Sequence, residues 1–300
     1  MERIKQALEK ARLERQRAGG SESSLPTGSK GSPGQVNYTH TRTVEVAESF
    51  LREKRLIAGR SQDPYTEAYK ILRTQVLQRL REKNWNSLAI TSPGFKEGKT
   101  LTAINLAISL AMEINYSVLL VDADLRDPGV HGFFGLTPER GLSDYLTSDI
   151  PLSEILVHPA GIPRFVILPG GKPLFNSSEM LNSPKLVRLV DELKARYPSR
   201  IILFDLPPLL NAADALAFSP YVDAALLVIE EGKTQAQDVQ HAVTLLQGTS
   251  LIGTVLNKSL VNMPREDAGI MKWLLRFFQY LRLYAVSFTA RLKGLRRRTS

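Results

Sequence analysis

The chain has no cysteine and only four histidines among its 300 residues. The lack of cysteine excludes disulfides and thiolate metal sites, and it fits a cytosolic setting. The histidines (His40, His131, His158 and His241) are scattered along the chain, so we interpret them as structural, because a metal site needs a convergent set. No apolar segment marks a signal peptide, since the N-terminus is charged, and we therefore expect a cytoplasmic protein.

Apolar residues make up 43% of the chain, which is enough for a sizeable core. The length suits one domain of about two hundred residues with extensions. We expect a charged N-terminal helix at 1–18 and a flexible linker at 19–45, where Gly, Ser, Pro and Lys gather. The domain itself then spans 46–262, and a basic amphipathic tail follows at 263–300.

Short apolar runs alternate with helical patterns through the domain. The predicted strands are 86–91, 117–122, 164–168, 200–205, 224–230 and 251–257, and the predicted helices include 184–196 and 235–247. Ser183-Pro184 is typical of a helix start, and Thr234 with Gln237 indicates a capping box. This alternation predicts an α/β fold, a parallel sheet with helices on both faces.

A glycine-containing loop stands between the first of these strands and a helix-forming run. It reads Ser92-Pro93-Gly94-Phe95-Lys96-Glu97-Gly98-Lys99-Thr100. Such a loop converges backbone N–H groups on one anion, and the positive end of the next helix points at the same place. Lys99 is expected to reach the β- and γ-phosphates of a nucleotide, and the Thr100 hydroxyl to hold Mg²⁺. The expected nucleotide-binding residues of the loop are Gly94, Glu97, Gly98, Lys99, Thr100 and Leu101.

The first glycine comes one residue later than in the common phosphate-loop pattern, at Gly94 rather than position 93. The alternative to a phosphate-binding loop is a structural Gly/Pro turn before an ordinary helix, with Lys99 exposed to solvent. The strand before the loop and the helix after it favour the phosphate-binding interpretation.

Aspartates end two further predicted strands. Asp122 and Asp124 follow the apolar run from 118 to 121, and Asp205 ends the run from 201 to 204. The carboxyl ends of parallel strands meet at the edge where an open α/β sheet binds its ligands. One aspartate after a strand is more often a turn or cap residue, but three of them beside a phosphate loop favour a Mg²⁺ site.

These segments together resemble the bacterial tyrosine kinases of the capsular and exopolysaccharide family. The loop, the run VLLVDADLRDP and the run IILFDLPP are similar to that family's Walker A, Walker A′ and Walker B motifs. Further agreement lies in Asp63–Thr74, Asn176–Leu181 and Gly253–Asn257, so the resemblance covers about residues 60 to 260. The wider superfamily includes the MinD and ParA ATPases, whose signature lysine would fall at Gly94 here.

The resemblance implies a role for each matching residue. Lys99, Asp122 and Asp124 would be catalytic, with Asp122 helping to activate the attacking tyrosine hydroxyl. Mg²⁺ would be held through Thr100, Asp122 and Asp205, and Asn257 would face the adenine. A phenol of pKa near 10 needs a proton acceptor, which explains a carboxylate beside the γ-phosphate of ATP.

Three features depart from the family pattern. The last forty residues hold two tyrosines, Tyr280 and Tyr284, in place of a tyrosine cluster, and these become the candidate autophosphorylation sites. In the segment that resembles the E-x-x-R-x-x-R oligomerisation motif, Glu67 and Arg73 match but Lys70 replaces an arginine and its bidentate fork. Leu206 also follows Asp205, where a small hydroxyl residue is common.

The tail carries most of the formal net charge of +9. From residue 270 onward it has eight basic residues and no acid, interleaved with aromatic and aliphatic side chains. This composition predicts an amphipathic helix lying on an anionic membrane surface, because charge interrupts it too often for spanning. A helix docked on the core or on another subunit is the alternative, and nucleic-acid binding is the least favoured one.

Three functions fit these observations. The first is a tyrosine autokinase at the inner face of the cell membrane that regulates polysaccharide polymerisation or export with a membrane co-polymerase or activator. The second is a MinD-like membrane-associated ATPase switch, and the third is a nucleotide-binding scaffold without catalysis. The first is our prediction, with ATP and Mg²⁺ as cofactors and a homo-oligomer through Glu67, Lys70 and Arg73.

Overall fold

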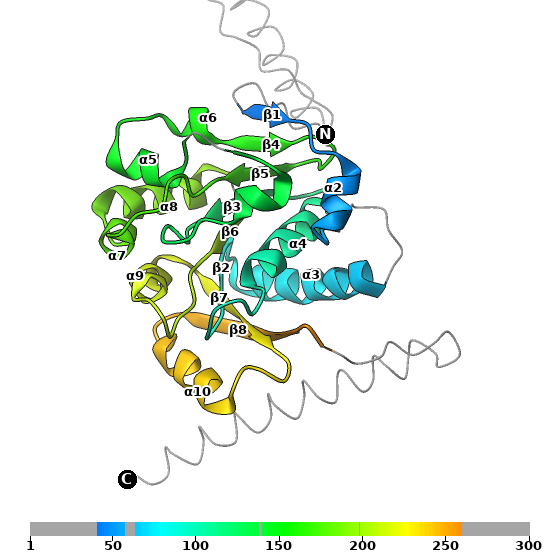
Figure 1. Ribbon diagram of the computed structural model, residues 1–300, viewed down its shortest axis with the longest axis vertical. Helices are drawn as coiled ribbons and strands as arrows, with labels where there is room; N and C mark the ends of the chain where they lie inside the picture. Colours follow the sequence, from blue (N-terminus) through cyan, green and yellow to red (C-terminus); the bar gives the residue numbers. More distant parts are fainter. Residues whose placement is uncertain (1–40, 58–63, 138–139, 198, 260–300) are drawn as a thin grey trace, which may run out of the picture. The chain divides into compact units, whose positions relative to one another are not determined.

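The computed structural model describes residues 41–57, 64–137, 140–197 and 199–259 (Figure 1). The expected N-terminal helix, most of the expected linker, the basic tail and its candidate tyrosines, Tyr280 and Tyr284, lie outside these residues. Among the helices described, none combines the length and the apolar character that crossing a membrane requires.

An eight-stranded sheet forms the centre of the fold, in the order β1-β4-β5-β3-β6-β2-β7-β8. All neighbouring strands are parallel except β4 and β5. The strands are β1 (Arg42–Val44), β2 (Ser87–Thr91), β3 (Ser117–Asp122), β4 (Val157–Pro159), β5 (Phe165–Leu168), β6 (Arg200–Asp205), β7 (Ala224–Glu230) and β8 (Ser250–Asn257). The parallel α/β class predicted from the sequence is therefore confirmed.

All six predicted strands are present, and two strands were not predicted. β1 and β4 have three residues each and pair with one another at one end of the sheet. β1 lies inside the range 19–45 that we assigned to the linker from the sequence, so the predicted C-terminal boundary of the linker was wrong. A strand this short carries no alternating apolar pattern, and its place is fixed by pairing with β4 rather than by composition.

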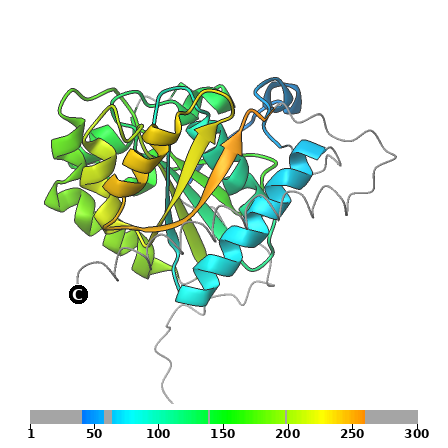
Figure 2. The same cartoon turned by 90° about the horizontal axis from the view of Figure 1, so that it is seen from below.

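Helices cover both faces of the sheet, as Figure 2 shows from below. One apolar core lies under α2, α3 and α4, and the other under α5, α8, α9 and α10. Alternate residues of each central strand enter the two cores, which explains why these strands are apolar throughout. The helices are α2 (Glu48–Glu53), α3 (Pro64–Lys83), α4 (Lys99–Ala111), α5 (Leu142–Thr147), α6 (Leu152–Ile155), α7 (Ser177–Leu181), α8 (Pro184–Arg196), α9 (Asp214–Phe218) and α10 (Ala236–Leu245), with short 3₁₀ turns at Val130–Phe134 and Ser219–Tyr221.

The two predicted helix starts have different outcomes. Ser183 caps α8 as predicted, because its hydroxyl accepts a hydrogen bond from the Leu186 N–H and Pro184 opens the helix. The capping box of Thr234 and Gln237 was wrong, since α10 begins at Ala236 without a side-chain cap. The Thr234 hydroxyl instead donates to the Glu97 carboxylate in the phosphate loop, at 2.6 Å.

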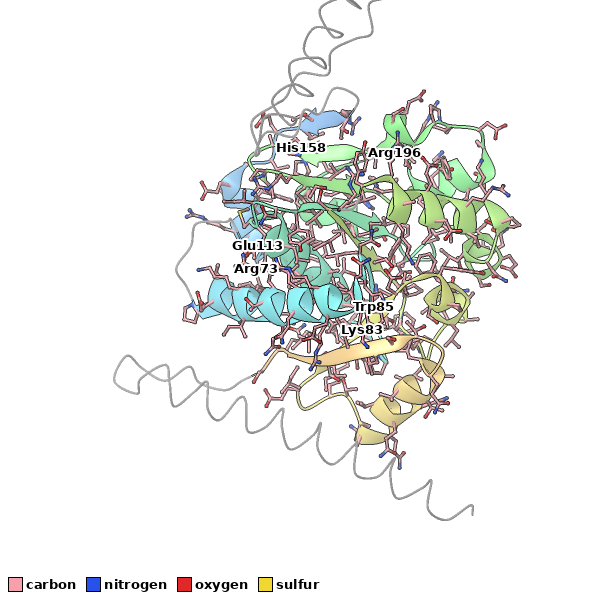
Figure 3. All side chains as sticks on the ribbon, turned by 180° about the vertical axis from the view of Figure 1, so that it is seen from behind. Arg73, Lys83, Trp85, Glu113, His158 and Arg196 are labelled. Carbon is pink, nitrogen blue, oxygen red and sulfur yellow. The ribbon has the colours of Figure 1, made fainter. Side chains whose placement is uncertain are left out.

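Arg73, expected in an oligomer contact, is engaged within its own chain. It forms an ion pair with Glu113 at 3.0 Å and donates to the Ser109 carbonyl at the end of α4, also at 3.0 Å (Figure 3). Glu67 and Lys70 pair with each other on the exposed face of α3. Arg73 thus ties α3 to α4, and only Glu67 and Lys70 of the three present charge at the surface.

At the amino ends of the strands, one aspartate joins β2, β7 and α8. Asp223 Oδ2 accepts hydrogen bonds from the backbone N–H groups of Asn86 and Ser87 and from the Ser87 hydroxyl. Its Oδ1 accepts from the Lys194 ammonium at 2.6 Å. Burial alone would raise the pKa of Asp223, but the hydrogen bonds from Lys194 and Ser87 outweigh it and lower that pKa.

Candidate active site

The predicted phosphate loop connects β2 to α4 at the carboxyl edge of the sheet. Two of its residues, Lys96 with φ 61° and Gly98 with φ 92°, adopt the left-handed conformation that lets the backbone curl. A Cβ at Gly98 would also collide with the Asn257 amide. Glycine at 98 is therefore required twice, by its dihedral angle and by the close approach of β8.

Glu97 supports the loop from inside. Its side chain is buried, with Oε2 accepting from the Gly94 N–H at 2.9 Å and Oε1 from the Thr234 hydroxyl. Its carbonyl accepts from the Asn257 amide at 2.8 Å. Glu97 and Asn257 therefore both stabilise the loop. The two carboxylate oxygens and the carbonyl of Glu97 and the amide nitrogen of Asn257 all form hydrogen bonds within the protein.

Lys99 opens α4 and points into a group of carboxylates. Its ammonium donates to Asp124 Oδ2 at 2.8 Å and lies 3.7 Å from Asp205 Oδ2. Burial opposes the charged form of Lys99, but Asp205 and Asp124 outweigh burial and raise its pKa. Lys99 is therefore protonated and is held where the loop ends. It is not exposed to solvent, as a simple structural turn would leave it.

Asp122 and Asp205 end adjacent strands and are partners in the register of β3 and β6. Asp205 Oδ2 accepts from the Thr100 hydroxyl at 2.7 Å, while its Oδ1 has no hydrogen-bond partner among the described residues. Asp122 Oδ2 accepts from the N–H groups of Gly129 and Val130 at 3.0 Å, and its Oδ1 is likewise without a partner in that part of the chain. Each strand end thus presents one buried oxygen that the fold itself does not satisfy.

Burial and mutual repulsion change the protonation of these two carboxyl groups. Desolvation, followed by the charge of Asp205, raises the pKa of Asp122 from 3.8 to about 8. Desolvation also raises the pKa of Asp205, to about 6, against the opposing effect of Lys99. Like charges on adjacent strand ends disfavour double ionisation, so these carboxyl groups hold a proton more tightly than a free aspartate does.

The donor set fits Mg²⁺ held together with a nucleotide. Within the described ranges, no three His, Cys, Asp or Glu side chains converge closely enough to bind a metal by themselves. Mg²⁺ in nucleotide sites takes one or two protein oxygens and completes its shell with phosphates and waters. The Thr100 hydroxyl and the unpartnered oxygens of Asp122 and Asp205 are suitable for that arrangement.

Two further positions from the sequence have structural explanations. Leu206, which replaces a small hydroxyl residue, is buried in the second core, and its N–H donates to the Ile90 carbonyl. Leu101, counted among the nucleotide-binding residues, packs partly buried against the first core. Leu101 therefore helps to fix α4 on the sheet behind the loop.

Several residues near the site were missed from the sequence. Lys233 and Lys258 donate to loop carbonyls, and both form ion pairs with Glu230. Arg126, in the segment after Asp124, contacts the fully buried Asp214 at 3.3 Å. The run DADLR displayed Arg126, but nothing in the sequence indicated its partner on a distant segment.

The chain is similar in sequence to proteins of known family. A model described as an AAA domain matches residues 94–260. Tyrosine-protein kinase YwqD of Bacillus subtilis is 33% identical over 203 residues, 67% of this chain and 84% of the relative. The succinoglycan biosynthesis transport protein ExoP of Rhizobium meliloti is 30% identical over 234 residues, 74% of this chain and 28% of the relative.

Among solved structures, the kinase domain of Escherichia coli tyrosine kinase ETK superposes with a TM-score of 0.64 at 27% identity. The superposition covers 76% of this chain and 93% of that one. The chain spans about a third of the length of several curated relatives that it matches, ExoP among them. The motifs, the sheet order and these similarities agree, and the chain belongs to the bacterial tyrosine-protein kinases of the P-loop class.

Proposed function

We propose that this chain is an ATP-dependent protein-tyrosine kinase that phosphorylates tyrosines, including its own. The observation that carries the proposal is the meeting of Lys99, Thr100, Asp122, Asp124 and Asp205 at one edge of the sheet beside the loop. Phosphoryl transfer asks a protein for positioning and charge neutralisation more than for covalent chemistry. This group of residues offers both.

The loop and the first turn of α4 would bind the phosphates. A glycine-containing loop before a helix directs N–H groups at an anion, and the Lys99 ammonium, now bonded to Asp124, would turn to the β- and γ-phosphates. Thr100, Asp205 and the unpartnered oxygen of Asp122 would hold Mg²⁺, which neutralises phosphate charge when bound. Asn257, expected to face the adenine, supports the loop by donating from its amide nitrogen to the Glu97 carbonyl.

Asp122 would take the proton of the attacking tyrosine. The tyrosine oxygen forms the new P–O bond, the bond from the γ-phosphorus to the ADP oxygen breaks, and the phenolic proton passes to Asp122. Asp122 would accept the proton in its ionised form, which the charge of Lys99 favours, and burial raises its pKa towards that of a phenol. Asp124 would hold the Lys99 ammonium beside the loop until a nucleotide binds.

The proposed role is regulation of exopolysaccharide or capsule polymerisation or export at the inner face of the cell membrane. The name of ExoP, a succinoglycan biosynthesis transport protein, supports this setting. A membrane co-polymerase or activator would be the partner, and the basic tail from 263 would bind anionic lipid. An oligomer would use Glu67 and Lys70, because Arg73 already pairs with Glu113.

The test is incubation of the purified chain with Mg·ATP, followed by mass spectrometry for phosphotyrosine. We expect phosphotyrosine in the wild type and none in Lys99→Ala, with Tyr280 and Tyr284 as the proposed acceptors. Lys83→Ala is the matched control, since Lys83 is an exposed lysine at the end of α3, before β2 begins (Figure 3). It should behave as the wild type.

Other outcomes would identify the alternatives. Steady ADP release without phosphotyrosine, with liposomes and a candidate activator present, would contradict the kinase proposal and favour a MinD-like ATPase switch. Binding of Mg·ATP with neither product would favour a nucleotide-binding scaffold.

A further inference from the structure

The carbonyls of three consecutive loop residues, 95 to 97, each accept a hydrogen bond from a side chain outside the loop. The donors, in the order of the carbonyls, are Lys233 Nζ at 2.9 Å, Lys258 Nζ at 2.7 Å and Asn257 Nδ2 at 2.8 Å. Lys233 follows β7, Asn257 ends β8, and Lys258 comes next. Residues at or just after the ends of β7 and β8, the last two strands at one side of the sheet, thus hold the phosphate loop.

One carboxylate joins the two lysines of this group. Glu230 Oε2 lies 3.2 Å from Lys233 Nζ and 2.9 Å from Lys258 Nζ. Glu230 and Asn257 are also register partners at the ends of β7 and β8. We name Glu230, Lys233, Asn257 and Lys258 the loop clamp.

The loop clamp determines which way the loop peptides face. In a planar trans peptide the N–H points opposite to the carbonyl, so fixing the carbonyls of 95 to 97 also fixes the N–H groups of 96 to 98. Those N–H groups belong to the set that a phosphate loop directs at its anion. Lys96, at φ 61°, is a left-handed non-glycine residue that such contacts stabilise.

Exposed ion pairs usually contribute little to stability. Lys233 and Lys258 are both about half exposed. Glu230 differs because its side chain is only 16% exposed and serves two ammoniums that each bind a second acceptor. The hydrogen bonds from Lys258 and Lys233 lower the pKa of Glu230, so it stays ionised. Its removal would loosen two lysines at once, each already committed to a loop carbonyl.

We propose that Glu230 is a positioning residue for nucleotide binding, acting through Lys233 and Lys258 to hold the phosphate loop in its anion-binding conformation. This inference rests on the proposed nucleotide-binding function. Glu230 touches neither the nucleotide nor the transferred group, so its effect is on affinity and loop order.

The experiment measures binding of Mg·ADP to the full chain by calorimetry, for wild type and Glu230→Gln. We expect about fivefold weaker binding in the variant, since two loop hydrogen bonds lose their orientation. Hydrogen exchange at the amides of 96 to 98 should become faster in the nucleotide-free variant. Glu192→Gln, which removes the same charge from an exposed pair with Arg196 on α8, should change neither quantity.

A second variant keeps the test decisive. Lys233→Met with Lys258→Met should weaken Mg·ADP binding at least as much, and Glu230→Gln should add less than about twofold in that background. Wild-type affinity and wild-type loop exchange in Glu230→Gln would overturn the inference. If the wild type itself failed to bind Mg·ADP, the proposed function would fall, while loop exchange would still show whether Glu230 holds the loop.

Discussion

The two edges of the sheet differ in how their aspartates are hydrogen-bonded. At the amino edge, Asp223 accepts hydrogen bonds at both oxygens, from Asn86 and Ser87 at the start of β2 and from Lys194, and its pKa is lowered. At the carboxyl edge, Asp122 and Asp205 each keep an oxygen without a partner among the described residues, and their pKa values are raised. Asp223 stabilises the fold. Asp122 and Asp205 lower its stability and leave oxygens that a ligand can use.

Strand register produces this contrast. Asp122 and Asp205 face each other because both end adjacent parallel strands, and each is only partly satisfied, Asp122 by two loop N–H groups and Asp205 by the Thr100 hydroxyl. Asp223 precedes β7, where the first N–H groups of β2 and the ammonium of α8 all reach it. Buried carboxylates with unpartnered oxygens at the carboxyl edge thus indicate function, and the fully hydrogen-bonded, partly buried Asp223 at the amino edge indicates stability.

The largest expected effect is on catalysis, from Asp122→Asn. The asparagine keeps the shape but cannot accept the phenolic proton, so we expect phosphotyrosine formation to fall about a hundredfold or more. Mg·ADP affinity should fall much less, because Lys99, the loop and the other two Mg²⁺ ligands, Thr100 and Asp205, remain. Asp127→Asn, an exposed change in the same segment, is the control and should retain activity. Equal rates for wild type and Asp122→Asn would remove Asp122 from the proposed mechanism.

The next effect is on stability, from Asp223→Ala. The change leaves the Lys194 ammonium and the N–H groups of Asn86 and Ser87 without their acceptor. We expect urea unfolding to show a loss of about 3 kcal/mol in the free energy of unfolding. Asp191→Ala, at an exposed position on α8, should cost much less. A similar cost for both variants would mean that the amino edge is no better satisfied than the surface.

A smaller effect of opposite sign is expected from Asp122→Asn on stability. The folded-state pKa of Asp122 is raised from 3.8 to about 8, so the unfolded chain loses this proton at lower pH than the folded chain does. Wild-type stability therefore falls as pH rises from about 4 to about 8, and the variant escapes that loss. We expect the variant to be more stable by about 2 kcal/mol at pH 8, with the advantage shrinking toward pH 4. A variant less stable than wild type at pH 8 would contradict this account.

Much of the central fold follows from local pattern. Four central strands, β2, β3, β6 and β7, are apolar runs bounded by polar residues, and the loop with Lys99 and Thr100 displays its chemistry in sequence. The short strands β1 and β4 were missed because three residues cannot show a period. Their position depends on pairing with each other, which no local pattern records.

The site was predicted in part, for a similar reason. Strand ends placed Asp122 and Asp205 together, but the Lys99–Asp124 contact and the loop clamp depend on how distant segments align. Thr234 shows the limit well: its sequence context favoured a helix cap, yet its hydroxyl bonds to Glu97 across the site. Tertiary contacts outweighed a local preference worth about 1 kcal/mol.

The smallest effect, and the sharpest test of the contrast, is the pH dependence at Asp223. Its folded-state pKa lies below 3.8, so its stabilisation is present above pH 3.8 and is lost as pH falls through the folded-state pKa. Asp223→Asn should therefore be less stable than wild type at neutral pH, by about 1 kcal/mol after solvent screening of the partly exposed Lys194 pair. Urea unfolding at pH 7, 5 and 3 should show this deficit shrinking only at the lowest pH. The two variants thus differ from wild type in opposite ways as pH rises. The stability deficit of Asp223→Asn is restored above its folded-state pKa, whereas the stability advantage of Asp122→Asn grows with pH. If both variants moved in the same direction, the two edges would share one electrostatic environment and the contrast between them would fail.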